Sequence, residues 1–466
     1  MNNDALRHSI EFIDSWLEFR FDREDIPGLT VAISYKGDLL LNKAYGYVDT
    51  EKKIELTPDY LFRIASHSKT FTATAIMMLV EDNKLRIDDY VVDYLSFIKK
   101  HKDKRWNKVT IRQLMSHGAG IIRDGVNEDY WQLIRPFPDE KRFKEEILNT
   151  DLVLDNNTKL KYSNYGYSLL GLVIEAVAAQ PYNDFVNERI IKKLGLNNTF
   201  PEYSKSINYR LTKGYSRIDI RNSRLPIQQI YTNCMSSATG FCSNGEDLCK
   251  YFNAQMIGSN KLLNDESKKE MQRMQWRAYD STQSESSDYG LGMEIESVGG
   301  KTLIGHGGGF PGHSTKTTFD PKSGLVVSVL TNCIDGPSLW INRGIWDVVN
   351  YFQDNTPKTK PKHDLKMLEG MYMNLWSIMS IVVTGDKVAA AHIDSWDPLS
   401  GVQDFEFVNN TTFKVVNADS YGYEGELVRF DIKAGKVETV NYTGSTMWPK
   451  DLWLKKIKDK KEISIP

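Results

Sequence analysis

The chain carries almost no net charge, few cysteines and no long apolar run. Lys plus Arg total 59 and Asp plus Glu total 61 among 466 residues, so the formal net charge is −2. This balance gives no electrostatic basis for binding a polyanion, and we expect no nucleic-acid partner. No stretch approaches the roughly 18 consecutive apolar residues of a membrane-spanning helix, so no membrane span is expected.

The cysteines and the N-terminus exclude further classes. Cys234, Cys242, Cys249 and Cys333 form no C-x-x-C pair and no zinc-type spacing with histidine. We expect four reduced thiols, no metal site and no cofactor. Residues 1–23 have the pattern of an amphipathic helix and lack the apolar core of a signal peptide. The prediction is therefore a cytoplasmic protein, or a periplasmic or secreted one if a leader was removed.

What is present indicates a folded chain of more than one domain. Hydrophobic residues make up 41% and aromatic residues 11%, as in globular proteins. At ~150 residues per domain, the length predicts two to four domains. Strand patterns occur at 28–45 and 301–331, while residues 85–230 are mainly helical. We expect a catalytic domain over 1–355: an antiparallel sheet flanked by helices (α/β, or α+β), whose first and last strands meet, with an all-helical insertion at about 85–230.

The composition changes near residue 355. Residues 354–362 contain two prolines and no large apolar side chain, which is typical of a linker. Short alternating apolar runs then recur, separated by turns such as Thr384-Gly385-Asp386. This spacing predicts a second domain at 356–466, an antiparallel sandwich or small barrel.

The first candidate group for catalysis is Ser66-His67-Ser68-Lys69, an S-x-x-K tetrad that opens a predicted helix at 66–83. The spacing places Ser66 and Lys69 on one helical face. Lysine can deprotonate serine if burial or nearby positive charge lowers its pKa. The backbone N–H of Ser66 can also stabilise an oxyanion. The alternative is that Ser66 only caps the helix and Lys69 is solvated.

Two further groups lie far away in the sequence. In Tyr162-Ser163-Asn164, Tyr162 can relay a proton and Asn164 can hold an amide; the alternative is a loop that only caps the next helix. His306-Gly307-Gly308-Gly309 follows a predicted strand. Glycines there permit close approach of a substrate, and Gly309 N–H can act as an oxyanion donor; the alternative is a glycine-rich turn.

Taken in order, these three groups resemble the signature set of the serine β-lactamase and penicillin-binding-protein family: S-x-x-K, Y-x-N, and K-T-G or H-x-G. Residues 26–33 resemble the first hairpin of that family. Residues 109–120 resemble its T-I-R-x-L-L-x-H-x-S-G landmark, with Met115 and Ala119 as departures. The resemblance covers about residues 25–350 and implies a β-lactamase/transpeptidase-like fold.

The resemblance also implies roles. Ser66 would be the acylated nucleophile, Lys69 its base or proton partner, and Tyr162 a proton shuttle; which of the last two takes the serine proton stays open. Asn164 would bind the substrate amide or hold Lys69. The remaining substrate-binding and oxyanion residues would be His306, Gly308 and Gly309. Four other residues are assigned to packing or loops: His67, Ser68, His117 and His313.

One departure points to a branch of the family. His306 stands where β-lactamases carry the lysine of K-T-G, and a histidine is only partly charged near pH 7. H-x-G members resemble D-aminopeptidases, D-peptidases and esterases. The expected function is a serine hydrolase of small amides or short peptides with D-residues. The alternatives are an esterase or weak β-lactamase, and a non-catalytic penicillin- or peptide-binding protein.

Two expectations concern regions beyond the motifs. Loops at 121–140 and 275–290 are expected to set specificity. The C-terminal domain resembles the lipocalin-like modules of related peptidases, so it would form a β-barrel that covers the site or supports a homo-oligomer.

Overall fold

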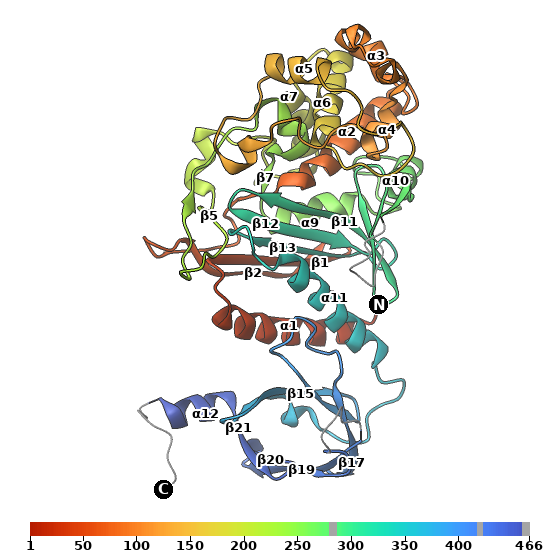
Figure 1. Ribbon diagram of the computed structural model, residues 1–466. Helices are drawn as coiled ribbons and strands as arrows, with labels where there is room; N and C mark the ends of the chain where they lie inside the picture. Colours follow the sequence, from red (N-terminus) through yellow and green to blue (C-terminus); the bar gives the residue numbers. More distant parts are fainter. Residues whose placement is uncertain (279–286, 417–422, 459–466) are drawn as a thin grey trace. The chain divides into compact units, whose positions relative to one another are not determined.

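The computed structural model describes residues 1–278, 287–416 and 423–458. The chain divides into two compact units (Figure 1): Asp25–Asn342, here the sheet unit, and Met1–Glu24 with Arg343–Pro466, here the barrel unit. The boundary expected near residue 355 stays a prediction. Residues 279–286 of the expected specificity loop lie outside the described part of the chain.

The sheet unit contains an antiparallel sheet, which confirms the predicted fold class. The described strands follow one another in space in an order different from that in the sequence. They are β3 (Ile54–Glu55), β2 (Asp38–Asp49), β1 (Gly28–Tyr35), β13 (Leu325–Thr331), β12 (His313–Phe319), β11 (Lys301–Phe310), β10 (Glu294–Val298), β9 (Ser287–Tyr289) and β8 (Trp276–Ala278).

The sheet brings the two ends of this unit together. Strand β1 pairs with β13 in a register that runs from Leu29↔Thr331 to Tyr35↔Leu325. All seven residues of β13 are buried. The prediction that the first and last strands meet is therefore confirmed.

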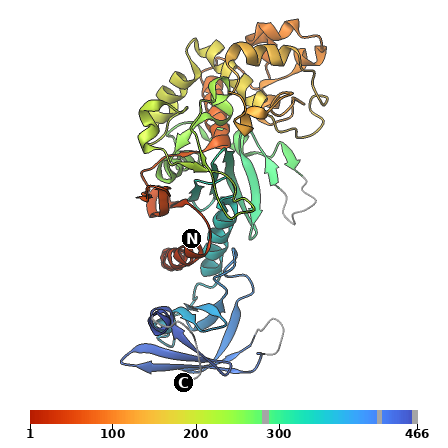
Figure 2. The ribbon, with the colours of Figure 1, turned by 60° about the vertical axis from the view of Figure 1, so that its left-hand side comes forward.

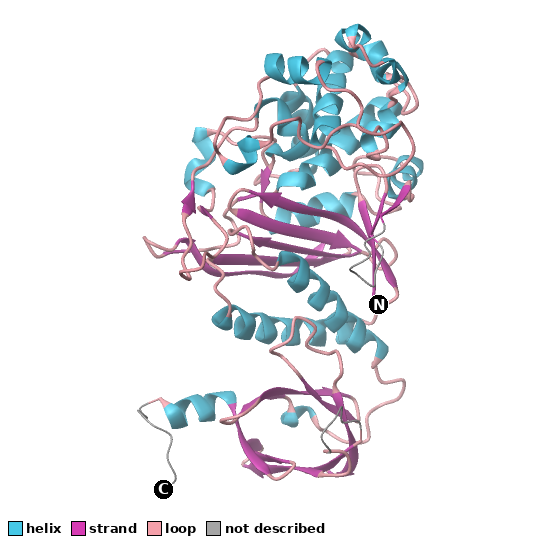
Figure 3. Cartoon of the chain, viewed as in Figure 1, coloured by secondary structure: helices cyan, strands magenta, loops and turns pink. Residues whose placement is uncertain are grey.

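The helices of the sheet unit from α2 to α10 gather on one side of this sheet (Figures 1–3). Helices α2 (Ser68–Glu81) and α6 (Asn164–Ala178) are buried along most of their length. Helix α6 is mostly apolar, whereas α2 also buries Lys69 and several threonines. Two short sheets, β4 (Phe62–Arg63) with β7 (Cys242–Ser243) and β5 (Gly214–Tyr215) with β6 (Pro226–Ile227), complete the unit. The helices are α2 (Ser68–Glu81), α3 (Val91–Tyr94), α4 (Ile111–Met115), α5 (Glu140–Leu148), α6 (Asn164–Ala178), α7 (Tyr182–Val186), α8 (Lys192–Leu194), α9 (Gly245–Ala254) and α10 (Asp265–Gln272).

Strand β11 is longer than the sequence pattern predicted. The glycine run was expected after the strand, but it lies within it. Pairing with β10 ends at Glu294↔Gly305, while pairing with β12 continues to Phe310↔His313. Beyond Gly305, the strand therefore keeps a strand partner on one side only, and on the other side the N–H of Gly307 donates to Glu294 Oε2 at 3.0 Å.

The barrel unit contains a closed eight-stranded antiparallel barrel. Of the two predicted architectures, a sandwich or a small barrel, the second is therefore the one observed. The sequence pattern missed β14, β21 and α12. Likeness to lipocalins stays a prediction. The strands are β14 (Gly370–Met373), β15 (Ile378–Thr384), β16 (Lys387–Ala391), β17 (Gln403–Asn409), β18 (Thr412–Val415), β19 (Leu427–Lys433), β20 (Lys436–Tyr442) and β21 (Ser445–Pro449), and α1 (Asn3–Arg23), α11 (Ser338–Asp354) and α12 (Lys450–Ile457) are the helices.

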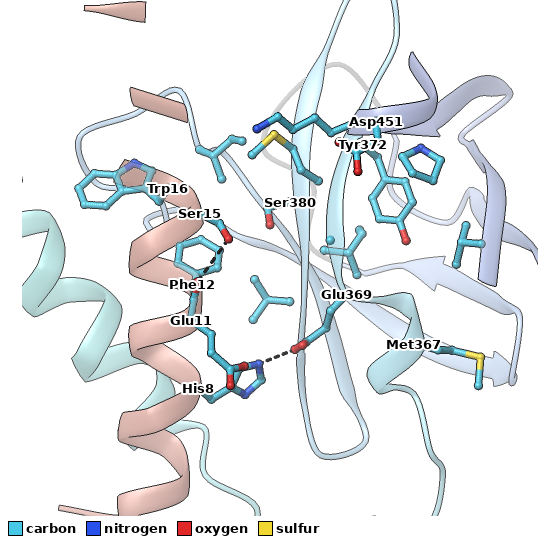
Figure 4. A pocket seen from close by; sticks show the side chains of 18 of the residues that line it. His8, Glu11, Phe12, Ser15, Trp16, Met367, Glu369, Tyr372, Ser380 and Asp451 are labelled. Atoms are coloured by element: carbon cyan, nitrogen blue, oxygen red, sulfur yellow. Dashed lines mark hydrogen bonds and ion pairs between the residues drawn. The ribbon is translucent and has the colours of Figure 1, made fainter. Parts of the chain in front are cut away.

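Helix α1 and the barrel border a pocket of about 520 Å³ (Figure 4). His8 Nε2 lies 2.6 Å from Glu369 Oε1 at its edge. Trp16 and Tyr372 contribute aromatic walls. The residues of the three motifs lie in the sheet unit, so this pocket is separate from them.

Candidate functional site

Ser66 and Lys69 lie at the start of α2. The predicted single helix begins with a 3₁₀ turn, Ala65–His67, and α2 follows from Ser68. Lys69 Nζ lies 3.0 Å from Ser66 Oγ. Ala65 has a φ of +47°, which costs a non-glycine residue on the order of 1 kcal/mol, and such strain is common at functional sites.

The Lys69 ammonium group is fully buried and has three hydrogen-bond acceptors. Besides Ser66 Oγ, they are Asn164 Oδ1 at 2.6 Å and the backbone oxygen of Ala238 at 2.9 Å. Burial lowers the pKa of Lys69 to about 7, and the positive charge of Arg123 acts in the same direction. A neutral Lys69 can keep its bonds to Asn164 and Ala238 and offer its lone pair to Ser66.

Tyr162 approaches Ser66 from another side. Its hydroxyl donates to Ser66 Oγ at 2.8 Å. Burial raises the pKa of Tyr162, so the side chain stays a phenol at neutral pH. The ring centre of His117 lies 4.2 Å from that of Tyr162, and His117 Nδ1 accepts from Ser163 N–H at 3.1 Å. These contacts place His117 beside the site as a packing residue.

The buried carboxylate of Asp124 lies next to Asn164. Its Oδ1 accepts from Asn164 Nδ2 at 2.7 Å, and its side chain is 2% exposed. Its negative charge raises the pKa of Lys69 and so opposes the effect of burial. Asp124 is thus linked to Lys69 through Asn164.

His306 is enclosed by protein groups. Nε2 lies 3.0 Å from the hydroxyl of Tyr289, and Nδ1 lies 2.6 Å from Gly307 O and 3.4 Å from Glu294 Oε1. Burial lowers the pKa of His306, although Glu294 opposes this effect. The lowered pKa favours the neutral form of the ring near pH 7.

Lys316, on the neighbouring strand β12, is paired with two carboxylates of β10. Its Nζ lies 2.7 Å from Glu294 Oε2 and also pairs with Glu296. Burial alone would lower the pKa of Lys316, but these two carboxylates raise it. The charge of Lys316 is neutralised inside the protein.

The two glycines of β11 differ in their surroundings. A Cβ at Gly308 would clash with the backbone oxygen of Ile64 and with Thr315 Oγ1. A Cβ at Gly309 would meet no heavy atom within 4 Å. Gly308 therefore allows β11 to pack against the backbone just before Ser66, and Gly309 faces open space.

Two other histidines of the sheet unit, His67 and His313, form hydrogen bonds inside the protein. His67 contacts Ile64 O at 2.9 Å and Thr317 Oγ1 at 3.0 Å, and burial lowers its pKa to about 3. His313 Nε2 lies 3.1 Å from Thr212 Oγ1. In the described part of the chain, no group of three His, Cys, Asp or Glu side chains is placed to hold a metal ion.

Sequence reasoning missed several residues of this site. Arg123 and Asp124 lie in the loop expected to set specificity, but no motif marked them. Ala238 contributes only its backbone oxygen, which any residue type provides. Glu294 and Tyr289 are recognisable only once β9, β10 and β11 are paired.

Comparison with known proteins identifies the family. A family model described as Beta-lactamase matches residues 13–340, so the chain belongs to the beta-lactamase family. Among curated relatives, "Protein flp" of Staphylococcus aureus strain MW2 is 25% identical over 69% of this chain. The match spans 62% of that relative's length. "Penicillin-binding protein 4" of Amycolatopsis lactamdurans is 23% identical over 68% of this chain and 84% of its own.

Solved structures share the fold. The octameric penicillin-binding protein homologue from Pyrococcus abyssi has a TM-score of 0.65 at 22% identity, over 94% of this chain and 99% of its own. The D-amino acid amidase from Ochrobactrum anthropi SV3, complexed with L-phenylalanine amide, has a TM-score of 0.63 at 22% identity, over 74% and 99%. At 22% identity, these structures show the fold that the chain shares with them. Among the described residues, no helix is both long and apolar enough to cross a membrane.

Proposed function

We propose that the protein is a serine hydrolase that works through an acyl-enzyme on a small amide or a short peptide with D-residues. The observation that carries this proposal is the Ser66 hydroxyl, bonded to Lys69 Nζ at 3.0 Å and to the hydroxyl of Tyr162 at 2.8 Å. A base and a proton donor at one serine are what acyl transfer requires.

In this proposal Lys69 is the base. Its pKa of about 7 leaves a large neutral fraction at neutral pH, whereas Tyr162, with its raised pKa, remains protonated. Neutral Lys69 takes the Ser66 proton as Oγ forms a bond to the substrate carbonyl carbon. The N–H groups of Ser66 and Gly309 stabilise the resulting oxyanion.

Collapse of this intermediate breaks the bond to the leaving group. For an amide, the C–N bond breaks as Tyr162, beside Ser66 Oγ, gives its proton to the departing nitrogen and takes the proton held by Lys69, which is then neutral again. Water then attacks the acyl carbon and gives its proton to the base, and Ser66 leaves with its hydroxyl restored. The net reaction consumes one water and needs no cofactor.

The choice of substrate rests on two observations. His306 is buried and neutral, so the site lacks the permanent cation that the lysine of K-T-G presents to a substrate carboxylate. The D-amino acid amidase and a D-stereospecific amidohydrolase from Streptomyces share this fold. These two observations, the buried His306 and the shared fold, lead us to propose a D-aminoacyl amide or peptide as the substrate in preference to a penicillin.

The decisive experiment treats the native protein with a fluorophosphonate probe and measures intact mass. We expect one adduct on the native protein and on Ser15→Ala, an exposed serine of α1, and none on Ser66→Ala. An adduct that persists in Ser66→Ala, or no adduct on the native protein, would contradict the assignment of the nucleophile.

A substrate screen then separates the alternatives. D- and L-aminoacyl amides, short acyl esters and a chromogenic cephalosporin are compared on native protein and Ser66→Ala. Fastest turnover of D-aminoacyl amides supports the proposal. Preference for the esters or the cephalosporin indicates the esterase or weak β-lactamase. A stable adduct without turnover indicates a non-catalytic binding protein.

We also propose that the chain self-associates through residues 356–466. The similar structure from Pyrococcus abyssi is octameric and matches 94% of this chain, including the barrel region. Sedimentation of the native chain and of a chain ending at residue 355 tests this. We expect an oligomer only for the native chain; a native monomer at all concentrations would contradict it.

A further inference from the structure

We propose that Asp124 is a positioning residue, whose buried carboxylate fixes the side-chain amide of Asn164 so that the amide oxygen holds Lys69 beside Ser66. This inference rests on the proposed function, because it concerns the base of the same nucleophile. Asp124 belongs to none of the three motifs.

Three hydrogen bonds connect Asp124 to the nucleophile. Asp124 Oδ1 accepts from Asn164 Nδ2 at 2.7 Å, and Asn164 Oδ1 accepts from Lys69 Nζ at 2.6 Å. Lys69 Nζ in turn lies 3.0 Å from Ser66 Oγ. The exposed fractions of Asp124 and Asn164 are 2% and 3%, so water does not compete for these bonds.

The chemistry of the amide makes this chain directional. An ionised carboxylate only accepts hydrogen bonds, so the NH₂ end of Asn164 must face Asp124. The oxygen end then faces Lys69, where only an acceptor can hold the amine. Asparagine at position 124 would offer both a donor and an acceptor, and Asn164 could pair with it in either orientation.

The backbone holds both partners in register. Arg123 O accepts from the N–H groups of Asn164 at 2.9 Å and Tyr165 at 3.2 Å. The hydroxyl of Tyr130 donates to Asp124 O at 2.7 Å. The loop that carries Asp124 is therefore docked on the N-terminus of α6, which carries Asn164. The separation of the two side chains is set by main-chain contacts.

Asp124 and its neighbour Arg123 shift the pKa of Lys69 in opposite directions. Burial is the main cause of the lowered pKa of Lys69; Asp124 raises that pKa and Arg123 lowers it. Arg123 Nε also donates to Asp124 Oδ2 at 3.1 Å, and its guanidinium is 62% exposed. Titratable and charged side chains surround Lys69, and they are Asp124, Arg123, Glu294, His117, His306, Tyr162 and Tyr167.

The test measures the rate of Ser66 labelling by a fluorophosphonate as a function of pH. For Asp124→Asn we expect the plateau rate to fall about tenfold, because Asn164 no longer holds Lys69 in one orientation. We also expect the midpoint to move to lower pH by roughly one unit, because a negative charge near the ammonium is lost. Arg123→Gln should move the midpoint the other way, with the plateau within about threefold of native.

A double-mutant cycle separates positioning from general damage. If Asp124 acts through Asn164, Asp124→Asn should change the plateau rate less than twofold, or about 0.4 kcal/mol, in an Asn164→Ala background. Asp247→Asn is the matched control: Asp247 is also a buried carboxylate, which accepts from the N–H of Asn198 at 2.7 Å and from Thr199 Oγ1 at 3.1 Å. It should leave both the plateau and the midpoint unchanged.

The outcomes are distinguishable. Native protein that is not labelled on Ser66 overturns the proposed function and this inference with it. Labelled native protein, together with an unchanged profile of Asp124→Asn or an undiminished effect in the Asn164→Ala background, overturns the inference alone. Should Asp124→Asn fail to fold in a thermal melt, Asp124→Glu takes its place. It keeps the charge, so the plateau should fall while the midpoint stays; an unchanged plateau overturns the inference.

Discussion

At the scale of single residues, the state of Lys69 determines how activity depends on pH. Its folded-state pKa of about 7 means that the amine is mostly protonated below pH 7 and cannot accept the Ser66 proton. We expect the rate of acylation to rise as the pH increases through about 7 and to level off above it, since Tyr162 stays protonated there. Stopped-flow acylation from pH 5 to 9 measures this; a rate that is flat across pH 6–8 would contradict Lys69 as the base.

His306 offers a second prediction at this scale. Its ring is buried and its pKa is lowered, so His306→Lys would introduce a cation. The neighbouring Glu294, 3.4 Å from the histidine, is already paired with Lys316 and so cannot fully neutralise this new charge. Because charge attraction adds to binding, we expect kcat/KM to rise several-fold for an ester bearing a free carboxylate, relative to its methyl ester. An unchanged ratio between the two substrates would argue against a role of position 306 in recognition.

At the scale of elements, Gly308 of β11 packs against the backbone of Ile64, and we expect this contact to set the geometry of the proposed oxyanion site. Gly308→Ala would push the strand away from Ile64 O, so we expect a loss of about 1–3 kcal/mol in the free energy of unfolding and at least a tenfold loss of acylation rate. Gly309→Ala is the matched control. Its Cβ has open space and its N–H remains, so stability should be native. Urea unfolding and probe labelling of both variants check this; equal behaviour would contradict the close-packing argument.

At the scale of the whole molecule, each unit can be considered on its own contacts. In the barrel unit, α1 joins the segment after β16: Trp16 Nε1 donates to Ser395 O at 3.2 Å, and the Arg20 guanidinium lies 3.8 Å from the ring centre of Trp396. We expect Trp396→Ala to lower the free energy of unfolding by about 1 kcal/mol. Trp376→Ala, at a tryptophan that is 89% exposed, should change it by less than about 0.5 kcal/mol. Calorimetry compares them; equal melting temperatures would contradict a stabilising role for this contact.

Much of the architecture follows from local pattern. The strand pattern at 28–45 and the short runs of the barrel predict elements close to those observed, because hydrophobic patterning is a local property. The observed element boundaries differ from the predicted ones where tertiary contacts outweigh the local sequence preference. The glycines of β11 discourage a strand locally, yet pairing with β12 extends the strand through them. The turn before α2 is 3₁₀ because Ala65 adopts a left-handed conformation.

By itself, the sequence determined which chemical groups are available: a serine and a lysine one turn apart, a tyrosine and an asparagine before a buried helix, and glycines that let a strand approach closely. Short spacings along one chain segment encode such relations, so Ser66 and Lys69 could be paired in advance. Only the tertiary structure decided their charge states and their supports. Burial from all sides lowers the pKa of Lys69 and keeps His306 neutral. Asp124 reaches Asn164 because a loop docks on a helix 40 residues later in the chain. Desolvation and long-range contacts depend on what the rest of the chain places around a residue, so a local sequence pattern cannot predict them.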